Sequence, residues 1–324
     1  MDLRKVHFID QNNGFAVGGL GTRIMKTENG GKSWRHIQIV NHEQLKGLWF
    51  NKDGTGYIVG SGSRILMTEN NGEEWNTVNG KNSVQDHIDL LIFTAHGDDS
   101  PISHGFLMTY LSRDENRDIA AVHITRDTHS NEYRGEYYNY ECDRSHYLMG
   151  VKSTMHFDEF DTGNSGATSF HINLRLWKGY DEMERHMVAA IRAYRPEVVI
   201  THDPIYGEYD KPAHKIAGRA GIRAFYDAGE PDRFPELTRL GLQPFQPQKI
   251  YVYATPAFPA TYRYEYMLDV SLEELGETVS EWANRALRCF QSQGIHFVGH
   301  TPLHLVKSYV SVPEKEGSIF DGLD

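Results

Sequence analysis

Short apolar runs alternate with longer amphipathic stretches through most of this 324-residue chain. The runs are Ile88–Thr94, Ile119–Thr125, Val198–Thr201 and Ile250–Ala254. A strand buried in a parallel sheet shows as such a short apolar run, and a parallel connection needs a crossover long enough for a helix. We therefore expect residues 83–324 to fold as an α/β domain with a Rossmann-like, mainly parallel sheet flanked by helices.

Two of the stretches between these runs carry clear helix signals. Asp181–Tyr194 has an apolar face and is followed by Pro196, which predicts an amphipathic helix that ends there. Ser271–Glu274 has the pattern of a capping box and predicts the start of a long helix. The glycines of this region do not form a G-x-G-x-x-G pattern, so no dinucleotide site is indicated.

The first 80 residues contain an internal repeat of about 41 residues, the usual size of a propeller blade. Gly14–Gly18 matches Gly56–Gly60, and Thr22–Trp34 matches Ser63–Trp75. Each copy alternates apolar and polar residues and then turns through Asn and Gly. We therefore expect a small all-β domain of two propeller-blade-like repeats. The domain would span residues 1–82, with the repeats at about 1–40 and 41–80.

The two Thr-Glu-Asn turns, each closed by a Trp, resemble the Asp-box of BNR-type propeller repeats. The resemblance implies that polar side chains tie down a hairpin turn while the Trp packs between strands. Two blades cannot close a propeller, and exposed sheet edges favour a partner surface. Either the pair packs as a β layer on the second domain, or blades from several subunits combine in a homo-oligomer. A trimer would supply six blades. The repeats would serve as scaffold, or as a carbohydrate-binding or oligomerising module.

Composition excludes several partner classes. The formal net charge is −11 and no long basic cluster occurs, which argues against a nucleic-acid partner. No apolar stretch approaches the ~20 residues of a membrane span, and Met1–Val6 lacks the apolar core of a signal peptide. Only Cys142 and Cys289 occur, far apart, so we expect two buried thiols, no disulfide and a cytoplasmic protein.

Polar residues cluster directly after two of the predicted strands. His96, Asp98 and Asp99 follow the first run, and His202 follows the third. In open α/β sheets ligands bind at the carboxyl edge of the strands. Two His and one Asp, with His214 as the distant second His, can hold a zinc ion and leave a position open for water. A further Asp can take a proton from that water.

Residues 83–324 resemble the LmbE-like/PIG-L family of zinc-dependent N-deacetylases. Five motifs of that family occur in order here: Ala95–Ser100, Thr125–Asp127, Tyr194–Pro204, Tyr209–His214 and Phe290–Gln293. The resemblance implies an amidohydrolase acting on carbon–nitrogen bonds other than peptide bonds. A small N-acylated substrate is implied, with an acetyl group on an amino sugar as the family-level expectation.

Carried over residue by residue, the resemblance implies zinc bound by His96, Asp99 and His214, with Fe2+ or Mn2+ able to replace it. It implies Asp98 as the general base, and Tyr209 as a group that polarises the amide. Lys211 stands where the family has a His. Substrate contacts or support of the ligands are expected from a further set of polar residues: Arg126, Asp127, Asp161, His202 and Asp203.

The chain departs from the family pattern at four positions. Gly97 replaces a Pro, Ser100 a Glu, Lys211 a His and Ala213 an Asp. The metal ligands are intact, but a Lys is a poorer acid than a His at neutral pH. The leading hypothesis is therefore a zinc-dependent deacetylase. The alternative is a divergent, non-catalytic metal- or ligand-binding protein whose β repeats recognise a carbohydrate or a partner.

Overall fold

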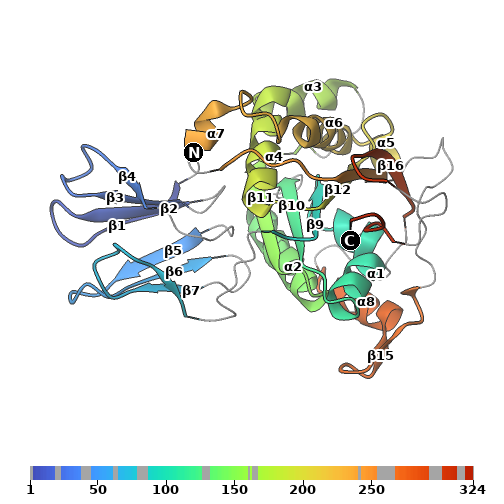
Figure 1. The fold of residues 1–324 in the computed structure, drawn as a ribbon, viewed down its shortest axis with the longest axis horizontal. Coiled ribbons are helices and arrows are strands. Elements are labelled where there is room, and N and C mark those ends of the chain that lie inside the picture. Colours follow the sequence, from blue (N-terminus) through green and yellow to red (C-terminus); the bar gives the residue numbers. More distant parts are fainter. Residues whose placement is uncertain are drawn as a thin grey trace.

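The computed structural model contains two small antiparallel sheets followed by a six-stranded sheet layered between helices (Figure 1). The parts of the chain that it describes are residues 3–18, 23–37, 45–60, 65–78, 87–125, 132–159, 161–162, 167–239, 242–253, 267–291, 301–311 and 318–323. The two small sheets, drawn in blue, stand at one side of the α/β part.

Each half of the internal repeat forms its own four-stranded antiparallel sheet in simple sequential order. The first sheet comprises β1 (Leu3–Phe8), β2 (Gly14–Gly18), β3 (Arg23–Thr27) and β4 (Arg35–Ile37). The second comprises β5 (Leu45–Phe50), β6 (Gly56–Gly60), β7 (Ile65–Thr68) and β8 (Asn76–Thr77). The repeated sequence therefore gives two repeated β units. The described strands do not close a ring.

The turn that follows β3 has the same hydrogen bonds as the turn that follows β7. Thr27 Oγ1 accepts from Gly31 N at 2.9 Å, and Trp34 Nε1 donates to Gly31 O at 3.1 Å. In the second copy Thr68 Oγ1 accepts from Gly72 N at 2.9 Å, and the Trp75 indole donates to Gly72 O at 3.2 Å. The polar residues thus satisfy backbone groups in both turns, as the sequence pattern predicts.

The two small sheets share one apolar core. Phe15 of the first sheet stacks on Phe50 of the second, with ring centroids 4.6 Å apart, and Trp75 packs edge-on against Phe50. Glu73 adds ion pairs to Lys26 and to Arg35 across the same boundary. The repeats therefore bury their apolar faces against each other.

The central sheet has the strand order β11-β10-β9-β12-β13-β16. Its first five strands pair in parallel and β16 pairs antiparallel to β13. The strands are β9 (Leu90–Thr94), β10 (Ile119–Thr125), β11 (Ser153–Glu159), β12 (Val198–His202), β13 (Lys249–Tyr253) and β16 (Leu303–Ser308). The mainly parallel Rossmann-like sheet that the apolar runs predict is confirmed.

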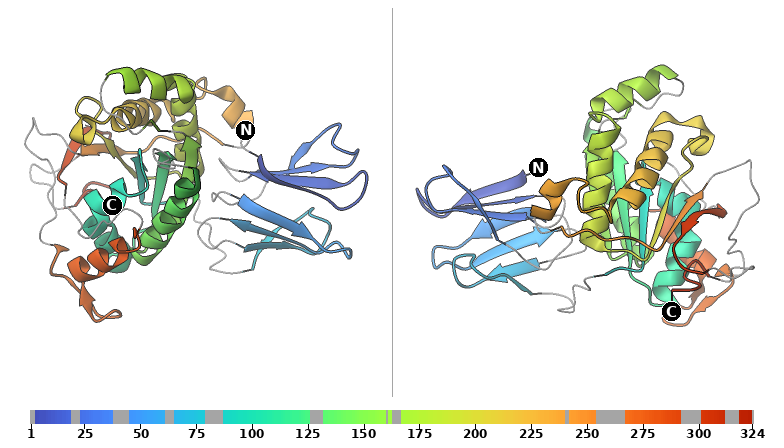
Figure 2. Two further views of the ribbon diagram at one scale, coloured as in Figure 1. Left: turned by 180° about the vertical axis from the view of Figure 1, so that it is seen from behind. Right: turned by 45° about the horizontal axis from the view of Figure 1, so that its top comes forward.

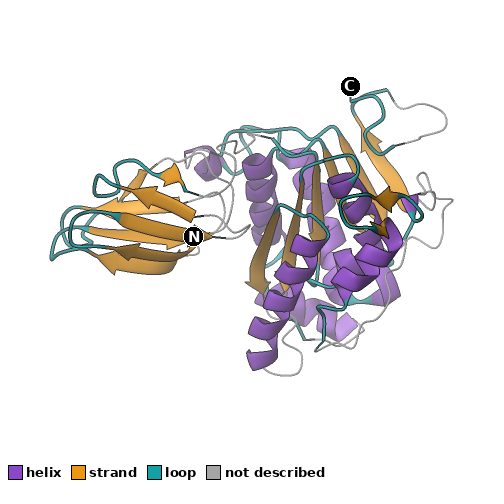
Figure 3. Cartoon of the chain, turned by 90° about the horizontal axis from the view of Figure 1, so that it is seen from below, coloured by secondary structure: helices purple, strands orange, loops and turns teal. Residues whose placement is uncertain are grey.

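Helices cover both faces of this sheet (Figures 1 and 2). One face packs on α1 (Asp99–Arg113), α2 (Glu132–Leu148) and α8 (Val279–Leu287), and the other on α3 (Ala167–Leu176), α4 (Tyr180–Tyr194) and α6 (Pro212–Asp227). Short helices α5 (Gly207–Asp210) and α7 (Pro235–Arg239) complete the set. Leu90 and Ile92 of β9 join one core, and Leu91 and Phe93 join the other. Because both faces are buried, the strand is apolar throughout. Figure 3 shows the helices on either side of the strands.

The prediction of a long helix that begins at Ser271 is wrong. Residues there form a hairpin of β14 (Ser271–Leu272) and β15 (Glu277–Thr278), and α8 begins after it. Thr278 and Glu281 make the capping box instead, since the Thr278 side chain accepts from Glu281 N and Glu281 accepts from Thr278 N. Gly276, at φ +66°, supplies the turn.

No helix among the described residues is both long and apolar enough to cross a membrane. Both cysteines are free, Cys142 being buried and Cys289 half-buried. The motif residues Ser292 and Gln293 lie outside the described residues, as do Arg126 and Asp127.

Candidate metal and active site

The candidate site lies where the strand order of the central sheet reverses. The chain runs from β9 outward through β10 to β11, and then returns to the other side of β9 with β12. The connections after β9 and β12 therefore lead away in opposite directions, and such a switch point is where open α/β sheets bind ligands. His96, Asp98 and Asp99 follow β9, while His202 ends β12.

Three predicted ligands meet at this switch point. His96 Nδ1 lies 3.0 Å from His214 Nε2 and 3.3 Å from Asp99 Oδ2. The distance from His214 Nε2 to Asp99 Oδ1 is 3.4 Å. All three side chains are buried, and their ligand atoms lie within 4.8 Å of one another. Two imidazole nitrogens and a carboxylate are a donor set that suits zinc.

Asp161 holds the ring of His96 from the other side. His96 Nε2 lies 2.8 Å from Asp161 Oδ2, and Asn173 Nδ2 donates to Asp161 Oδ1 at 2.6 Å. Asp161 is 4% exposed, so it lies behind the ligand cluster. A carboxylate in this position fixes the orientation and tautomer of a ligating His. The predicted contact between Asp161 and substrate stays a prediction, and Asn173 is a partner that the sequence did not reveal.

The charges of the cluster counteract the effect of burial. Burial disfavours the imidazolium form of His96, but the carboxylates of Asp99 and Asp161 outweigh it and raise the pKa of His96 well above its usual value. Burial would likewise raise the pKa of Asp99, but His214 and His96 hold it well below its usual range. The pKa of His214 is lowered, chiefly by burial. The Asp99 carboxylate is therefore ionised, which is the form in which it binds metal, whereas His96 must release a proton before it can do so.

Asp98, the predicted base, is half-buried at the amino end of α1 and is held by a tyrosine. Tyr138 of α2 donates its hydroxyl hydrogen to Asp98 Oδ1 at 2.5 Å, and the Tyr138 hydroxyl oxygen accepts from Asp98 N at 2.8 Å. The carboxylate is thereby fixed beside the ligands but outside their cluster. Nothing in the sequence pointed to Tyr138, because it lies 40 residues away on another helix.

His202 and Asp203 support the site from within the fold. His202 Nε2 accepts from Ala95 N at 3.0 Å and lies 3.3 Å from Asp99 Oδ2. Its ring is fully buried and stacks on His214, with centroids 4.2 Å apart. Asp203 Oδ1 accepts from the backbone N–H groups of the next turn, at 2.7 Å each. In the contacts that the structure describes, His202 holds Ala95 N and packs on His214, and Asp203 holds the backbone of the turn that follows it.

The segment before α6 brings a carboxylate that the sequence did not single out. Glu208 accepts from Ser103 Oγ at 3.3 Å, and its Oε2 lies 3.8 Å from His214 Nδ1. Burial, together with the charge of Asp99, raises the pKa of Glu208 to about 7. Lys211 is exposed at the amino end of α6, and its charge acts in the opposite direction on Glu208. Tyr209 belongs to α5, but its side chain lies outside the described residues.

Two departures from the family motif are explained by contacts with α2. A Cβ atom at Gly97 would lie 2.6 Å from Cys142 Sγ and 3.3 Å from Tyr138 Cε1, so a larger residue does not fit there. Ser100 Oγ pairs with His146 Nε2 at 2.8 Å. Gly97 and Ser100 therefore both allow close packing against α2.

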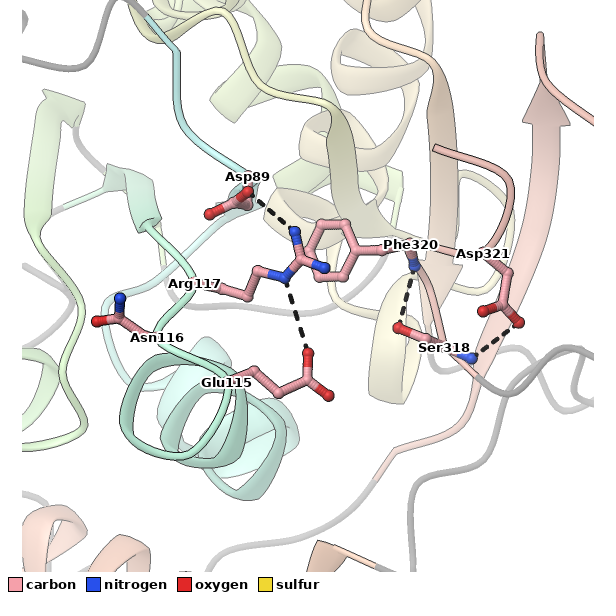
Figure 4. A pocket seen from close by; sticks show the side chains of 7 residues that line it. All are labelled: Asp89, Glu115, Asn116, Arg117, Ser318, Phe320 and Asp321. Atoms are coloured by element: carbon pink, nitrogen blue, oxygen red, sulfur yellow. Dashed lines mark hydrogen bonds and ion pairs between the residues drawn. The ribbon is translucent and has the colours of Figure 1, made fainter. Parts of the chain in front are cut away.

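A cavity of about 610 Å³ lies at the opposite edge of the sheet, before the strands begin (Figure 4). Its cation, Arg117, pairs with Asp89 at 3.4 Å and with Glu115 at 3.7 Å. The same guanidinium covers the ring of Phe320, 4.4 Å from its centroid. The charge of Arg117 is therefore matched by carboxylates that line the same cavity.

Residues 91–225 match the family model described as PIG-L: GlcNAc-PI de-N-acetylase. The matched region runs from β9 to α6 and includes all three predicted ligands. The α/β part of the chain is therefore similar in sequence to this family.

Two curated relatives carry the name 1D-myo-inositol 2-acetamido-2-deoxy-α-D-glucopyranoside deacetylase. The one from Streptomyces avermitilis is 38% identical over 78 residues, which is 24% of this chain and 26% of the relative. That of Thermobifida fusca is 29% identical over 191 residues, 52% of this chain and 62% of its own. The chain therefore spans less than two thirds of either relative.

The solved structure of N,N'-diacetylchitobiose deacetylase from Pyrococcus horikoshii aligns with 70% of this chain and 87% of its own, at 18% identity and a TM-score of 0.47.

Proposed function

We propose that this protein is a zinc-dependent N-deacetylase of a small substrate, with an acetylated amino sugar as the favoured class. The observation that carries the proposal is the convergence of His96, Asp99 and His214 at the switch point of the sheet. The names of the curated relatives, which are deacetylases of a 2-acetamido sugar conjugate, support the substrate class.

His96, Asp99 and His214 would hold the metal, and Asp161 would keep the His96 ring in place. When bound, the cation would lower the pKa of a water from about 15.7 towards about 7 and polarise the amide carbonyl. Fe2+ or Mn2+ could fill the same nitrogen and oxygen donor set. His202 supports the cluster by packing, since its ring stacks on that of His214.

Asp98 takes the proton of the attacking water in this proposal. Its carboxylate is fixed by Tyr138 and lies next in sequence to the ligand Asp99. When the C–N bond breaks, the amine nitrogen needs a proton, and Asp98 returns the one that it took. Water and amide thus become a carboxylic acid and an amine with the protons in balance.

Lys211 and Tyr209 are proposed to stabilise the developing oxyanion. The exposed Lys211 brings a positive charge to the edge of the site, where a point charge favours negative oxygen. Arg126 and Asp127 remain proposed substrate contacts, as does Asp161.

The test is amine release from a panel of N-acetylated amino sugars and their conjugates by the zinc-loaded protein. Asp98→Ala should keep its zinc and lose about 10²–10⁴-fold in kcat, since it removes a general base. Asp114→Ala is the matched control, because Asp114 is an exposed carboxylate just past the other end of α1. It should keep both its zinc and its turnover.

Full turnover in Asp98→Ala would contradict the role of Asp98. If zinc binds and no amine appears from any substrate of the panel, the result favours the alternative, a metal-dependent binding protein. Lys211 would then be the first residue to restore to His.

We also propose that residues 1–82 are two BNR/Asp-box blades and that residues 83–324 are the deacetylase domain. The equivalent turns of the two small sheets support this division. Blades of neighbouring subunits would then combine, and a trimer would supply six, within the ~4–8 blades of closed propellers. Light scattering at micromolar concentration should give an oligomer, and a monomer would exclude a ring assembled from several chains.

A further inference from the structure

A second group of ligating side chains lies on the α2 side of the loop that carries Asp98. It consists of His123 from β10 and of Cys142 and His146 from α2. All three are 0% exposed, and one ligand atom from each lies within 4.8 Å of the others. The proposed deacetylation uses none of them. We call this group the His123–Cys142–His146 cluster.

The hydrogen bonds of His123 determine which of its nitrogens is bare. Thr94 Oγ1 donates its single proton to His96 O at 2.7 Å. The same oxygen lies 2.7 Å from His123 Nδ1, so it must accept there and Nδ1 must carry the hydrogen. Nε2 of His123 therefore carries a lone pair, and this atom is buried without a hydrogen-bond partner among the described residues. A ring nitrogen bared in this way, with the other nitrogen donating, is the arrangement of a metal ligand.

His146 can present a lone pair to the same space. Its Nε2 lies 2.8 Å from Ser100 Oγ, and its Nδ1 lies 2.8 Å from the Cys142 carbonyl oxygen. Because a carbonyl oxygen only accepts, Nδ1 carries the hydrogen in this arrangement and donates it to Cys142 O. To bind a metal through Nδ1, the ring must give up that bond and donate Nε2–H to Ser100 instead, while the Cys142 carbonyl keeps its helical backbone bond. Ser100 then plays for His146 the part that Thr94 plays for His123.

The spacing of the cluster fits a tetrahedral ion. Cys142 and His146 are four residues apart on α2 and so share one helix face. The distance from Cys142 Sγ to His146 Nδ1 is 3.4 Å. Zinc–sulfur and zinc–nitrogen bonds of about 2.3 and 2.0–2.1 Å imply a separation of about 3.5 Å between such ligands in a tetrahedral site.

We propose that the His123–Cys142–His146 cluster is a second cation site, for a borderline-soft divalent ion such as zinc, that fastens α2 to β10. One thiolate and two imidazoles are ligands that such an ion prefers. On binding, the Cys142 thiol releases its proton to solvent and sulfur donates its electron pair to the metal. The Cys142 thiol donates to Gly97 O at 3.4 Å in the metal-free protein, and the metal-bound thiolate would give up this bond. The same helix carries Tyr138, which fixes Asp98, so the second ion would set the position of the base.

The two proposed sites can be separated by their ligands, because only the second contains sulfur. Metal-free protein is titrated with Co2+, and the near-ultraviolet thiolate-to-cobalt absorption is followed together with the number of ions bound. We expect two ions per chain in the natural sequence, one of which produces this absorption. Asp99→Ala should lose one ion and keep the absorption. Cys142→Ser should lose the absorption and the other ion.

Cys289→Ser is the matched control, since Cys289 is the other cysteine of the chain and lies outside the cluster. It should keep both ions and the absorption. His123→Gln gives an independent variant on β10, and it should weaken the binding that produces the absorption. Far-ultraviolet circular dichroism checks that each variant is folded. Absence of thiolate absorption in the cobalt-loaded natural sequence, or its loss in Cys289→Ser and not in Cys142→Ser, overturns the proposal, whether or not the protein deacetylates anything.

Discussion

Two histidine clusters lie on either side of one short loop, and they are built differently. In the candidate zinc site the ring of His96 lies between two carboxylates, and they keep its pKa well above the usual value against the effect of burial. In the His123–Cys142–His146 cluster the rings meet hydroxyl groups and a carbonyl. Burial lowers the pKa of His146 to about 4 and that of His123 well below its usual value.

The difference shows how partners set the chemistry of one residue type. A carboxylate behind an imidazole increases its basicity and its hold on a metal, whereas a hydroxyl fixes the tautomer without adding charge. The first arrangement suits an ion that must bind strongly beside an Asp base. The second keeps neutral rings in a dry interior, where charged ones would be costly.

The largest effect should come from removing the charge behind His96. Asp161→Asn keeps the size of the side chain but not its charge, so zinc affinity at the His96 site should fall about 10–100-fold. Competition with a chromophoric chelator measures this affinity. Asp232→Asn, at an exposed carboxylate, is the control and should have no effect. Unchanged zinc affinity with a raised KM would instead identify Asp161 as the substrate contact that the family resemblance implies.

Local sequence patterns predicted the strands and the polar residues that directly follow them. The apolar runs gave β9 and β10 to within two residues, and the motif that follows β9 gave His96 and Asp99. Strand burial and ligand spacing leave marks in a few neighbouring residues, and parallel strands then bring the loops to one edge. His214 lies 118 residues beyond His96, so its place beside them depends on the tertiary fold.

Side chains that reach a site from a helix packed against it showed no such local sequence pattern. Tyr138, Asn173 and His146 reach the site from helices whose placement depends on the tertiary fold. The helix start near Ser271 failed for a related reason, because Ser271–Glu274 and Thr278–Glu281 both have the capping-box pattern. The turn at Gly276, together with the pairing of β14 with β15, decides between them.

The next effect is confined to acid pH and concerns the stability of the fold. Burial lowers the pKa of His104 in α1 to about 3, against 6.5 for an unfolded His. Below pH 6.5 the unfolded chain binds a proton at this residue that the folded chain does not, so stability falls as the pH falls. Between pH 6.5 and 4 this costs about 3 kcal/mol. Urea unfolding of His104→Gln should therefore depend less steeply on pH over that range. His171→Gln, at an exposed histidine of α3, should follow the natural protein. Parallel curves for all three would mean that His104 can be protonated in place.

The smallest effect tests whether the two clusters form one packed unit. Gly97→Ala places a methyl group 2.6 Å from Cys142 Sγ and 2.9 Å from Cys142 Cβ, and such overpacking should cost about 1–3 kcal/mol in unfolding free energy. Cys142→Ala removes the sulfur but keeps Cβ, so the double variant should recover only part of that cost. A coupling of at least about 0.5 kcal/mol in the double-mutant cycle is expected for residues in contact. Additive changes in unfolding free energy would mean that Gly97 and Cys142 contribute to stability independently of each other. Coupling would instead mean that Gly97, where the family has Pro, is the residue that lets α2 approach closely enough for Tyr138 to hold the base.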